Sequence, residues 1–231
     1  MSTKILFENS NFLILDKPSG LVVHPFDYSQ EETLLDFLSV HSPSIFSFEN
    51  TKKLQDGREI NLGGIVHKLD RETSGSMVIA KDKETFEILS SQFKNHEVEK
   101  EYIALVEGIV EKQSFIIDAP LGRNKKEYRQ SVHPSNLRGQ LREAITEVSV
   151  ISRNEKENTT LVSLIPKTGR THQLRVHMAH IGHPILGDKI YGNKETSSTR
   201  LMLHAKKLSF SINGEKYEFE TETPEQFTKN Q

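Results

Sequence analysis

The chain of 231 residues contains no cysteine, which excludes disulfides, thiol nucleophiles and cysteine-based zinc sites. A chain without cysteine fits a reducing compartment. The sequence also has no apolar run near the roughly 20 residues that a membrane-spanning helix needs. Residues 1–8 contain neither a long apolar core nor a small-residue cleavage site, so we expect no signal peptide. The length fits one domain or two closely joined lobes.

The chain has little net charge, but its charges are unevenly distributed. The formal net charge of −2 argues against a generally adhesive polycation. Between residues 123 and 142, however, six basic residues face one acidic residue: Arg123, Lys125, Lys126, Arg129, Arg138 and Arg142. Residues 214–227 carry five glutamates and one lysine. This asymmetry indicates either a basic face for a polyanion or ordinary solvated loops.

Periodicity predicts more strands than helices. Amphipathic spacing indicates helices over residues 33–40, with Thr33 as the N-cap, and over residues 83–98 and 171–181. Apolar or alternating segments predict strands at residues 12–16, 77–80, 100–108, 114–117, 144–151, 160–165, 201–212 and 216–220. Asn213-Gly214 predicts a hairpin turn between the last two, and residues 42–60 are expected to form a mobile surface loop. The pattern predicts an α+β fold with a mixed, mostly antiparallel sheet.

Two polar segments carry the candidate chemistry. In the first, residues 67–82, Asp70 lies between Lys68 and Arg71 and precedes a buried strand. A lone carboxylate of this kind is commonly a solvated or helix-capping group, and that alternative stays open at this point. In the second, residues 166–191, Arg170 lies between a predicted strand and a predicted helix. There it is suited to bind a phosphate or to pair with a catalytic carboxylate.

Histidines in the second segment raise the question of a metal. Four of them occur within twelve residues: His172, His177, His180 and His183. The run has no H-E-x-x-H pattern, and Asp188 is the one nearby acid. We therefore expect no metal, and interpret these histidines as structural hydrogen-bonding groups or as lining of an RNA groove. A histidine-ligated metal hydrolase is the alternative.

Five segments, in order along the chain, resemble the motifs of the RluA family of pseudouridine synthases. The tyrosine segment is residues 100–108, and the arginine segment is residues 168–177, continuing to residue 188. The other three are residues 15–25, the catalytic segment 67–75 and the final strand 200–205. The resemblance covers about residues 12–210. It implies one catalytic domain over residues 1–231, with a bisected sheet, flanking helices and a central catalytic cleft.

The resemblance also implies the roles of individual residues. Asp70 would be the catalytic aspartate, Tyr102 would lie against the target base, and Arg170 would be the cation paired with Asp70. Leu174 would pack at the base pocket. We assign further substrate-binding residues to the same two segments: His67, Lys68, Arg71, Thr73, Lys167 and Arg175. The reaction would convert uridine in tRNA or ribosomal RNA to pseudouridine without a metal or an organic cofactor.

One position departs from the family pattern. The residue after the motif histidine is commonly arginine, which helps to fill the space left by a flipped nucleotide, and here it is Lys68. Lysine has no planar guanidinium to stack on bases, so Arg71 is a candidate for part of that role. The chain starts almost directly on the first motif, so we expect no separate N-terminal RNA-binding domain. Recognition would then depend on the cleft and on residues 123–142.

The expected partner is RNA, with no membrane association, in a cytoplasmic monomer. The alternative from another class is a catalytically silent RNA-binding protein on the same fold. Lys68 is the one feature that favours this alternative, whereas the presence of Asp70, Tyr102 and Arg170 favours the enzyme.

Overall fold

The computed structural model describes residues 3–25, 31–54, 56–124, 129–133, 137–192, 198 and 200–228. The chain, predicted as a single catalytic domain, divides into two compact units. Unit 1 comprises Met1–Glu99 and Lys207–Thr221, and unit 2 comprises Lys100–Lys206 and Glu222–Gln231. Each unit has its own apolar core. No helix in the described part of the chain is both long and apolar enough to cross a membrane.

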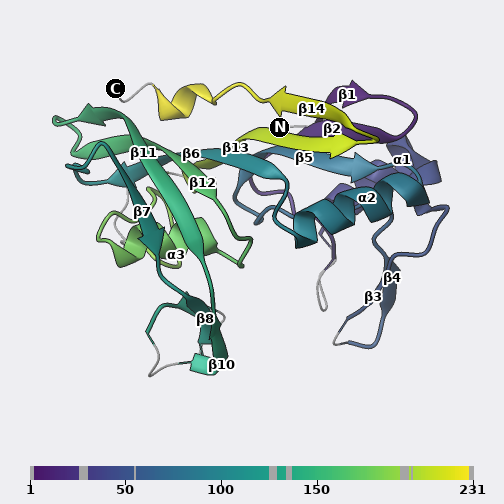
Figure 1. The fold of residues 1–231 in the computed structure, drawn as a ribbon, viewed down its shortest axis with the longest axis horizontal. Helices are drawn as coiled ribbons and strands as arrows, with labels where there is room; N and C mark the ends of the chain where they lie inside the picture. Colours follow the sequence, from purple (N-terminus) through teal and green to yellow (C-terminus); the bar gives the residue numbers. More distant parts are fainter. Residues whose placement is uncertain are drawn as a thin grey trace. The chain divides into compact units, whose positions relative to one another are not determined.

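The sheet of unit 1 contains the antiparallel run β1 (Lys4–Glu8), β2 (Phe12–Lys17) and β5 (Ser74–Ala80). All seven residues of β5 are buried, as its apolar sequence predicts for a strand covered on both faces. Helix α2 (Lys83–Lys94) packs against β5 (Figure 1). It begins at Asp82, whose carboxylate accepts a hydrogen bond from the Thr85 N–H at 2.8 Å, a typical N-cap.

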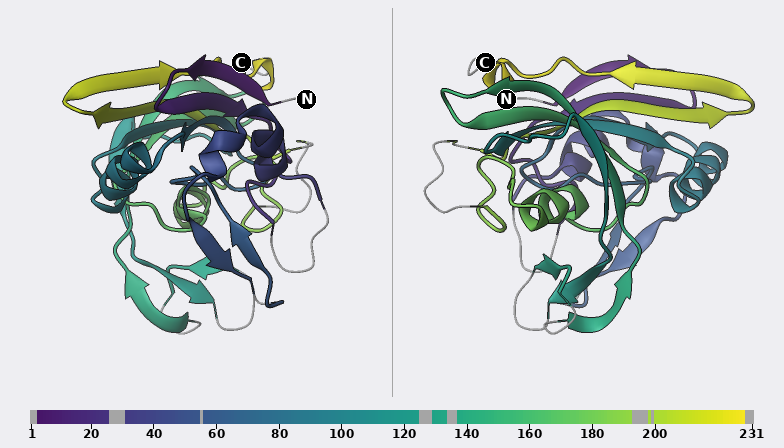
Figure 2. Two further views of the ribbon diagram at one scale, coloured as in Figure 1. Left: turned by 90° about the vertical axis from the view of Figure 1, so that its right-hand side faces the viewer. Right: turned by 60° about the vertical axis from the view of Figure 1, so that its left-hand side comes forward.

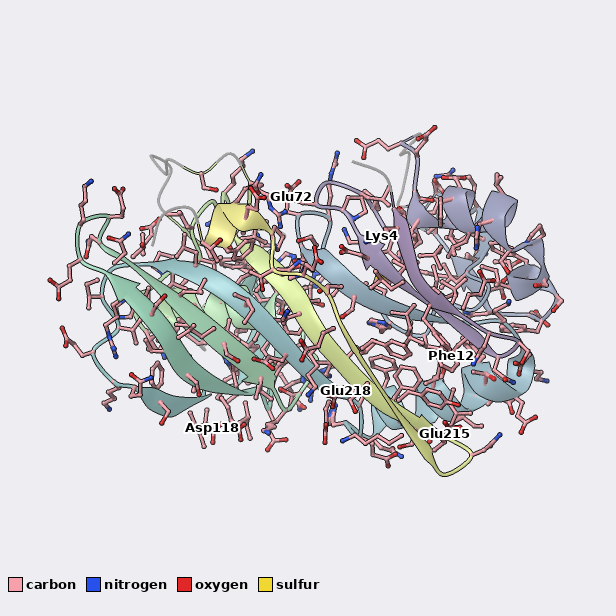
Figure 3. All side chains as sticks on the ribbon, turned by 90° about the horizontal axis from the view of Figure 1, so that it is seen from above. Lys4, Phe12, Glu72, Asp118, Glu215 and Glu218 are labelled. Atoms are coloured by element: carbon pink, nitrogen blue, oxygen red, sulfur yellow. The ribbon has the colours of Figure 1, made fainter. Side chains whose placement is uncertain are left out.

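A hairpin of β13 (Leu203–Ile212) and β14 (Glu215–Glu220) completes unit 1, although the first residues of β13 belong to unit 2. The predicted turn is confirmed: Asn213 and Gly214 have φ angles of 52° and 83°, as a two-residue type I′ turn requires. Figure 3 shows Phe12 near this hairpin. The rings of Phe12 and Phe210 meet edge to face with centroids 5.2 Å apart, a favourable aromatic arrangement.

Residues 42–60, predicted as a mobile loop, contain regular structure. They include a 3-10 helix, η1 (Pro43–Phe46), and the strands β3 (Thr51–Lys53) and β4 (Glu59–Asn61), which pair as a hairpin. Two asparagines anchor this segment: Asn50 Nδ2 donates to the Gly63 carbonyl at 2.7 Å, and Asn61 Nδ2 donates to the Phe48 carbonyl at 3.3 Å. The preceding helix α1 (Leu34–His41) follows Thr33, as predicted.

Unit 2 is built on an antiparallel sheet in the order β6 (Glu99–Glu107), β12 (Thr159–Pro166), β11 (Ile145–Asn154) and β7 (Ser114–Asp118). Helix α3 (Gln173–His180) contacts β12 and buries Leu174 and Met178 in the unit 2 core. The predicted α+β class with largely antiparallel pairing is therefore confirmed.

A small three-stranded sheet extends from unit 2. Its order is β10 (Leu137–Arg142), β8 (Leu121–Asn124) and β9 (Gln130–Ser131). Figure 2 shows it beyond the ends of β7 and β11. Four of the six predicted basic residues are described here, all with exposed side chains: Arg123, Arg129, Arg138 and Arg142. Lys125 and Lys126 lie outside the described residues.

Candidate active site

Asp70 lies in a turn immediately before the buried strand β5. The Thr73 N–H donates to the Asp70 carbonyl oxygen at 3.1 Å, which closes a four-residue turn. Asp70 is half-buried, whereas Thr73 is buried at the entry to the strand. The turn therefore fixes the main chain at Asp70 to the most buried strand of unit 1.

The first motif holds this turn from the other side. Lys17, at the end of β2, is fully buried. Its ammonium donates to the carbonyls of Pro18 at 2.9 Å, Leu21 at 2.8 Å and Arg71 at 3.0 Å. Three acceptors satisfy the three donors of an ammonium, which explains how lysine is tolerated at such burial. Lys17 thus connects the first motif to the residue that follows Asp70.

Two further bonds join the same segments. The Gly20 N–H donates to the Arg71 carbonyl at 2.9 Å, and the Ser19 hydroxyl donates to the Glu72 carbonyl at 2.7 Å. Sequence reasoning singled out this Lys-Pro-Ser-Gly segment as a turn and a family motif but assigned it no site role. The available signal was a lysine that ends an apolar strand and directly precedes a turn.

The remaining predicted residues of unit 1 differ in role. His67 Nε2 accepts a hydrogen bond from the Val78 N–H at 3.1 Å, and its ring stacks on Phe93 with centroids 4.4 Å apart. His67 therefore anchors the loop to β5 and α2. Lys68 is exposed. Arg71 forms an exposed ion pair with Glu31 at 3.1 Å, a kind of pair that contributes little to stability.

Unit 2 carries the other predicted residues. Tyr102 lies on β6 directly opposite Leu164 of β12, and its half-buried ring packs against the unit 2 core. Leu174 is buried in the same core. Lys167 forms an exposed ion pair with Glu147 at 2.9 Å.

Arg170 is held by its own loop. Its Nε donates to the Glu143 carbonyl at 2.9 Å, and its backbone N–H donates to Gln173 Oε1 at 3.0 Å. The same Gln173 oxygen accepts from the Thr168 hydroxyl at 2.7 Å. The Gln173 side chain thus organises the loop between β12 and α3. Because Arg170 and Asp70 belong to different units, their pairing stays a prediction.

Arg175 is the most deeply placed of the predicted cations. Its guanidinium is buried and forms a bidentate ion pair with Asp188, Nε to Oδ2 at 2.7 Å and Nη2 to Oδ1 at 2.8 Å. Burial alone would raise the pKa of Asp188, but Arg175 and the N–H groups of Ile190 and Tyr191 together lower it. This pair gives Arg175 a structural partner in addition to its predicted substrate-binding role.

His177 supports the structural interpretation of the histidines. It is buried, with Nδ1 2.9 Å from Thr146 Oγ1 and Nε2 3.0 Å from the Ala119 carbonyl. Burial lowers the pKa of His177, so the neutral ring donates from Nε2 and accepts at Nδ1. Among the residues that the structure describes, no group of three or more histidine, aspartate and glutamate side chains could hold a metal ion.

Comparisons with known proteins agree with these features. Residues 11–180 match the family model described as RNA pseudouridylate synthase. An uncharacterized RNA pseudouridine synthase of Aquifex aeolicus (strain VF5) is 38% identical over 234 residues, which cover 96% of this chain and 70% of that protein. Ribosomal large subunit pseudouridine synthase D of Borreliella burgdorferi is 36% identical over 226 residues, covering 96% of this chain and 66% of that protein.

A solved structure extends the likeness to the fold. The structure titled human RNA pseudouridylate synthase domain containing 1 has a TM-score of 0.78 and 28% identity, and the match covers 96% of this chain and 84% of that one. This chain spans about two thirds of the length of the two bacterial relatives. The matched range contains Asp70, Tyr102 and Arg170, and the resemblance to the RluA type is confirmed. The chain belongs to the RNA pseudouridylate synthase family.

Proposed function

We propose that this chain isomerises uridine to pseudouridine in RNA, with Asp70 as the catalytic carboxylate. The observation that carries the proposal is a set of hydrogen bonds from Lys17, Ser19 and Gly20 to the Asp70 turn, here called the Asp70 clasp. A fully buried lysine, a glycine N–H and a serine hydroxyl hold the main chain of Arg71 and Glu72. Such support is what a catalytic side chain needs to keep its geometry when substrate binds.

The reaction retains every heavy atom of the nucleotide and exchanges protons with solvent. The N1–C1′ bond breaks, the uracil rotates, a C5–C1′ bond forms, the C5 proton leaves and N1 gains a proton. Asp70 takes part in its ionised form, by attack on the sugar or the base or by removal of a 2′ proton. Arg170 would favour that form and orient it. Tyr102 would hold the detached base against its ring.

The target nucleotide must leave its helix to reach Asp70, which costs a few kcal/mol of unstacking. Lys68 and Arg71 flank Asp70 on the same loop, and Lys68 is exposed. In this proposal they contact the RNA beside the flipped nucleotide. We also propose that the substrate is bound or supported by two residues of unit 1, His67 and Thr73. Three residues of unit 2 would do the same: Lys167, Leu174 and Arg175.

Ribosomal RNA is the first substrate to test, because relatives of this chain carry the name ribosomal large subunit pseudouridine synthase D. Transfer RNA is the second. We further propose that the enzyme acts as a monomer in the cytoplasm, where both RNAs are used. Size-exclusion chromatography with light scattering tests the monomer, and a dimer mass would contradict it.

The decisive experiment measures tritium release from RNA transcribed with uridine labelled at C5, in the presence of a chelator. We expect release by the wild type, and a loss of about a thousandfold or more with Asp70→Asn, while RNA affinity stays within a few-fold. Asp118→Asn is the matched control, because this carboxylate is exposed at the end of β7 (Figure 3).

Each result has a defined meaning. Full activity of Asp70→Asn would contradict the catalytic role of Asp70. Binding without release by the wild type, on both ribosomal and transfer RNA, would favour the silent RNA-binding alternative. Activity that disappears with chelator and returns with added metal would favour a metal enzyme.

A further inference from the structure

The described part of the small sheet β8–β9–β10 carries exposed arginine side chains. Its described residues 121–124, 129–133 and 137–142 contain four arginines and no acidic residue. Arg123 on β8 lies directly opposite Arg138 on β10 in the strand register. Exposed arginines at opposed positions on neighbouring strands can contact successive phosphates of a polyanion.

The smallest strand of this sheet, β9, pairs with β8 and is also anchored by a side-chain hydroxyl group. The backbone N–H of Gln130, the first residue of β9, donates to the Tyr191 hydroxyl at 2.9 Å. That hydroxyl also lies 2.8 Å from Nδ1 of His172. It can therefore accept from Gln130 and donate to His172 at the same time. Arg129 immediately precedes the anchored residue, so the bond restrains one of the four arginines directly.

The other partner of the hydroxyl belongs to the entry of helix α3. His172 precedes α3 and has a φ of 55°, a left-handed conformation that is uncommon for a residue with a side chain. The hydrogen bond from Tyr191 helps to hold this conformation. One phenol thus joins β9 to the loop that contains Arg170.

The Tyr191 ring is itself firmly placed. Its N–H donates to Asp188 Oδ1 at 3.0 Å, and the guanidinium carbon of Arg175 lies 5.3 Å from the ring centroid. The ring also packs, together with Val132 of the segment after β9, on a small core of Leu121, Ala144 and Val176. The Arg175–Asp188 ion pair therefore fixes the position of the Tyr191 ring and its hydroxyl.

We propose that Tyr191 is a positioning residue for RNA binding: its hydroxyl holds β9 beside α3, so that the arginines of the β8–β9–β10 sheet meet the phosphates of the substrate RNA. The inference rests on the proposed function for the identity of the polyanion. Ordered cations cost less to bring to a phosphate backbone than mobile ones, because less side-chain and main-chain freedom is lost on binding. Tyr191 acts through these cations and not on the reacting nucleotide.

The test is Tyr191→Phe, which keeps the ring and its packing and removes only the hydroxyl. The matched control is Tyr217→Phe, because the Tyr217 hydroxyl bonds to Glu215 in the β13–β14 hairpin of unit 1. We measure KM and kcat by tritium release, and Kd for an unmodified large-subunit ribosomal RNA transcript at several salt concentrations. For Tyr191→Phe we expect KM and Kd to rise about fivefold, the cost of ordering about one mobile side chain on binding, with kcat within twofold of the wild type.

The salt dependence of RNA binding distinguishes a positioning role from a general loss of stability, because a loss of stability would not change its slope. The slope of log K against log salt should become shallower by about one for Tyr191→Phe. The double variant Arg123→Gln/Arg138→Gln should show the same direction with a larger change, and Tyr191→Phe should add little to it. Tyr217→Phe should match the wild type in every measurement.

Several results would overturn the inference. These are an unchanged KM and slope in Tyr191→Phe, a fall in kcat with KM unchanged, or a protein that does not fold. If the wild type shows no tritium release, the proposed function fails, yet the Kd and salt slope of Tyr191→Phe still decide this inference.

Discussion

At the scale of single residues, the candidate site contains a fully buried lysine that holds the Asp70 turn. Lys17 is fully buried and its ammonium bonds to three carbonyls, one of them in the Asp70 turn. Asp70 could be predicted from the sequence, because a carboxylate between two basic residues is a recognisable pattern. The sequence could not assign Lys17 this role, since a carbonyl more than fifty residues away leaves no mark in the local pattern.

We expect Lys17→Met to lower the free energy of unfolding by about 3 kcal/mol, because it removes three partly buried hydrogen bonds to the carbonyls of Pro18, Leu21 and Arg71. Turnover should fall as well, since the Asp70 turn loses one of its supports. Urea unfolding followed by circular dichroism measures the first effect and tritium release the second. Lys83→Met is the control: that side chain is exposed on α2, and we expect a change below about 0.5 kcal/mol. Equal free energies of unfolding for the Lys17 and Lys83 variants would contradict the stabilising role of Lys17 in the Asp70 clasp.

At the scale of elements, local turn chemistry was predictable and side-chain anchoring was not. Asn213-Gly214 gave the β13–β14 turn because its required φ angles suit those two residues. The β3–β4 hairpin was missed because Asn50 and Asn61 hold it through distant carbonyls, which composition does not reveal. The C-terminal 3-10 helix η3 (Glu225–Phe227) is a similar case, since Phe227 is fully buried against unit 2.

His204 of β13 should make the free energy of unfolding depend on pH. His204 of β13 faces the Phe227 ring at 6.2 Å, and burial lowers the pKa of His204 to about 4. The unfolded state, with a pKa near 6.5, binds the proton more readily, so stability is full above pH 6.5 and falls as the pH drops toward 4. The loss is about 3 kcal/mol. Chemical unfolding at pH 7, 5.5 and 4 measures it. His204→Gln should remove most of this dependence, and an unchanged pH profile in that variant would contradict the assignment.

At the scale of the whole molecule, the family assignment joins residues that the fold divides between two units. Asp70 belongs to unit 1, whereas Tyr102, Arg170 and Arg175 belong to unit 2. Their predicted meeting came from family motifs, because no periodicity in the sequence relates positions a hundred residues apart. Within unit 2 the two arginines have separate partners: a backbone carbonyl for Arg170 and a buried carboxylate for Arg175. Substitution can therefore separate a catalytic role from a structural one.

If Arg170 pairs with Asp70 during the reaction, Arg170→Ala should lower kcat/KM about a hundredfold near neutral pH. The free energy of unfolding should change little, since Arg170 is half-buried and its side chain donates to a backbone carbonyl.

Arg153→Ala is the matched control, because the Nε of Arg153 also donates to a carbonyl at 2.9 Å and Arg153 has no predicted role in the site. Arg175→Ala should instead destabilise the fold by about 3–5 kcal/mol, because it leaves the Asp188 carboxylate buried without its cation. An Arg170→Ala variant as fast as the wild type would exclude Arg170 as the partner of Asp70.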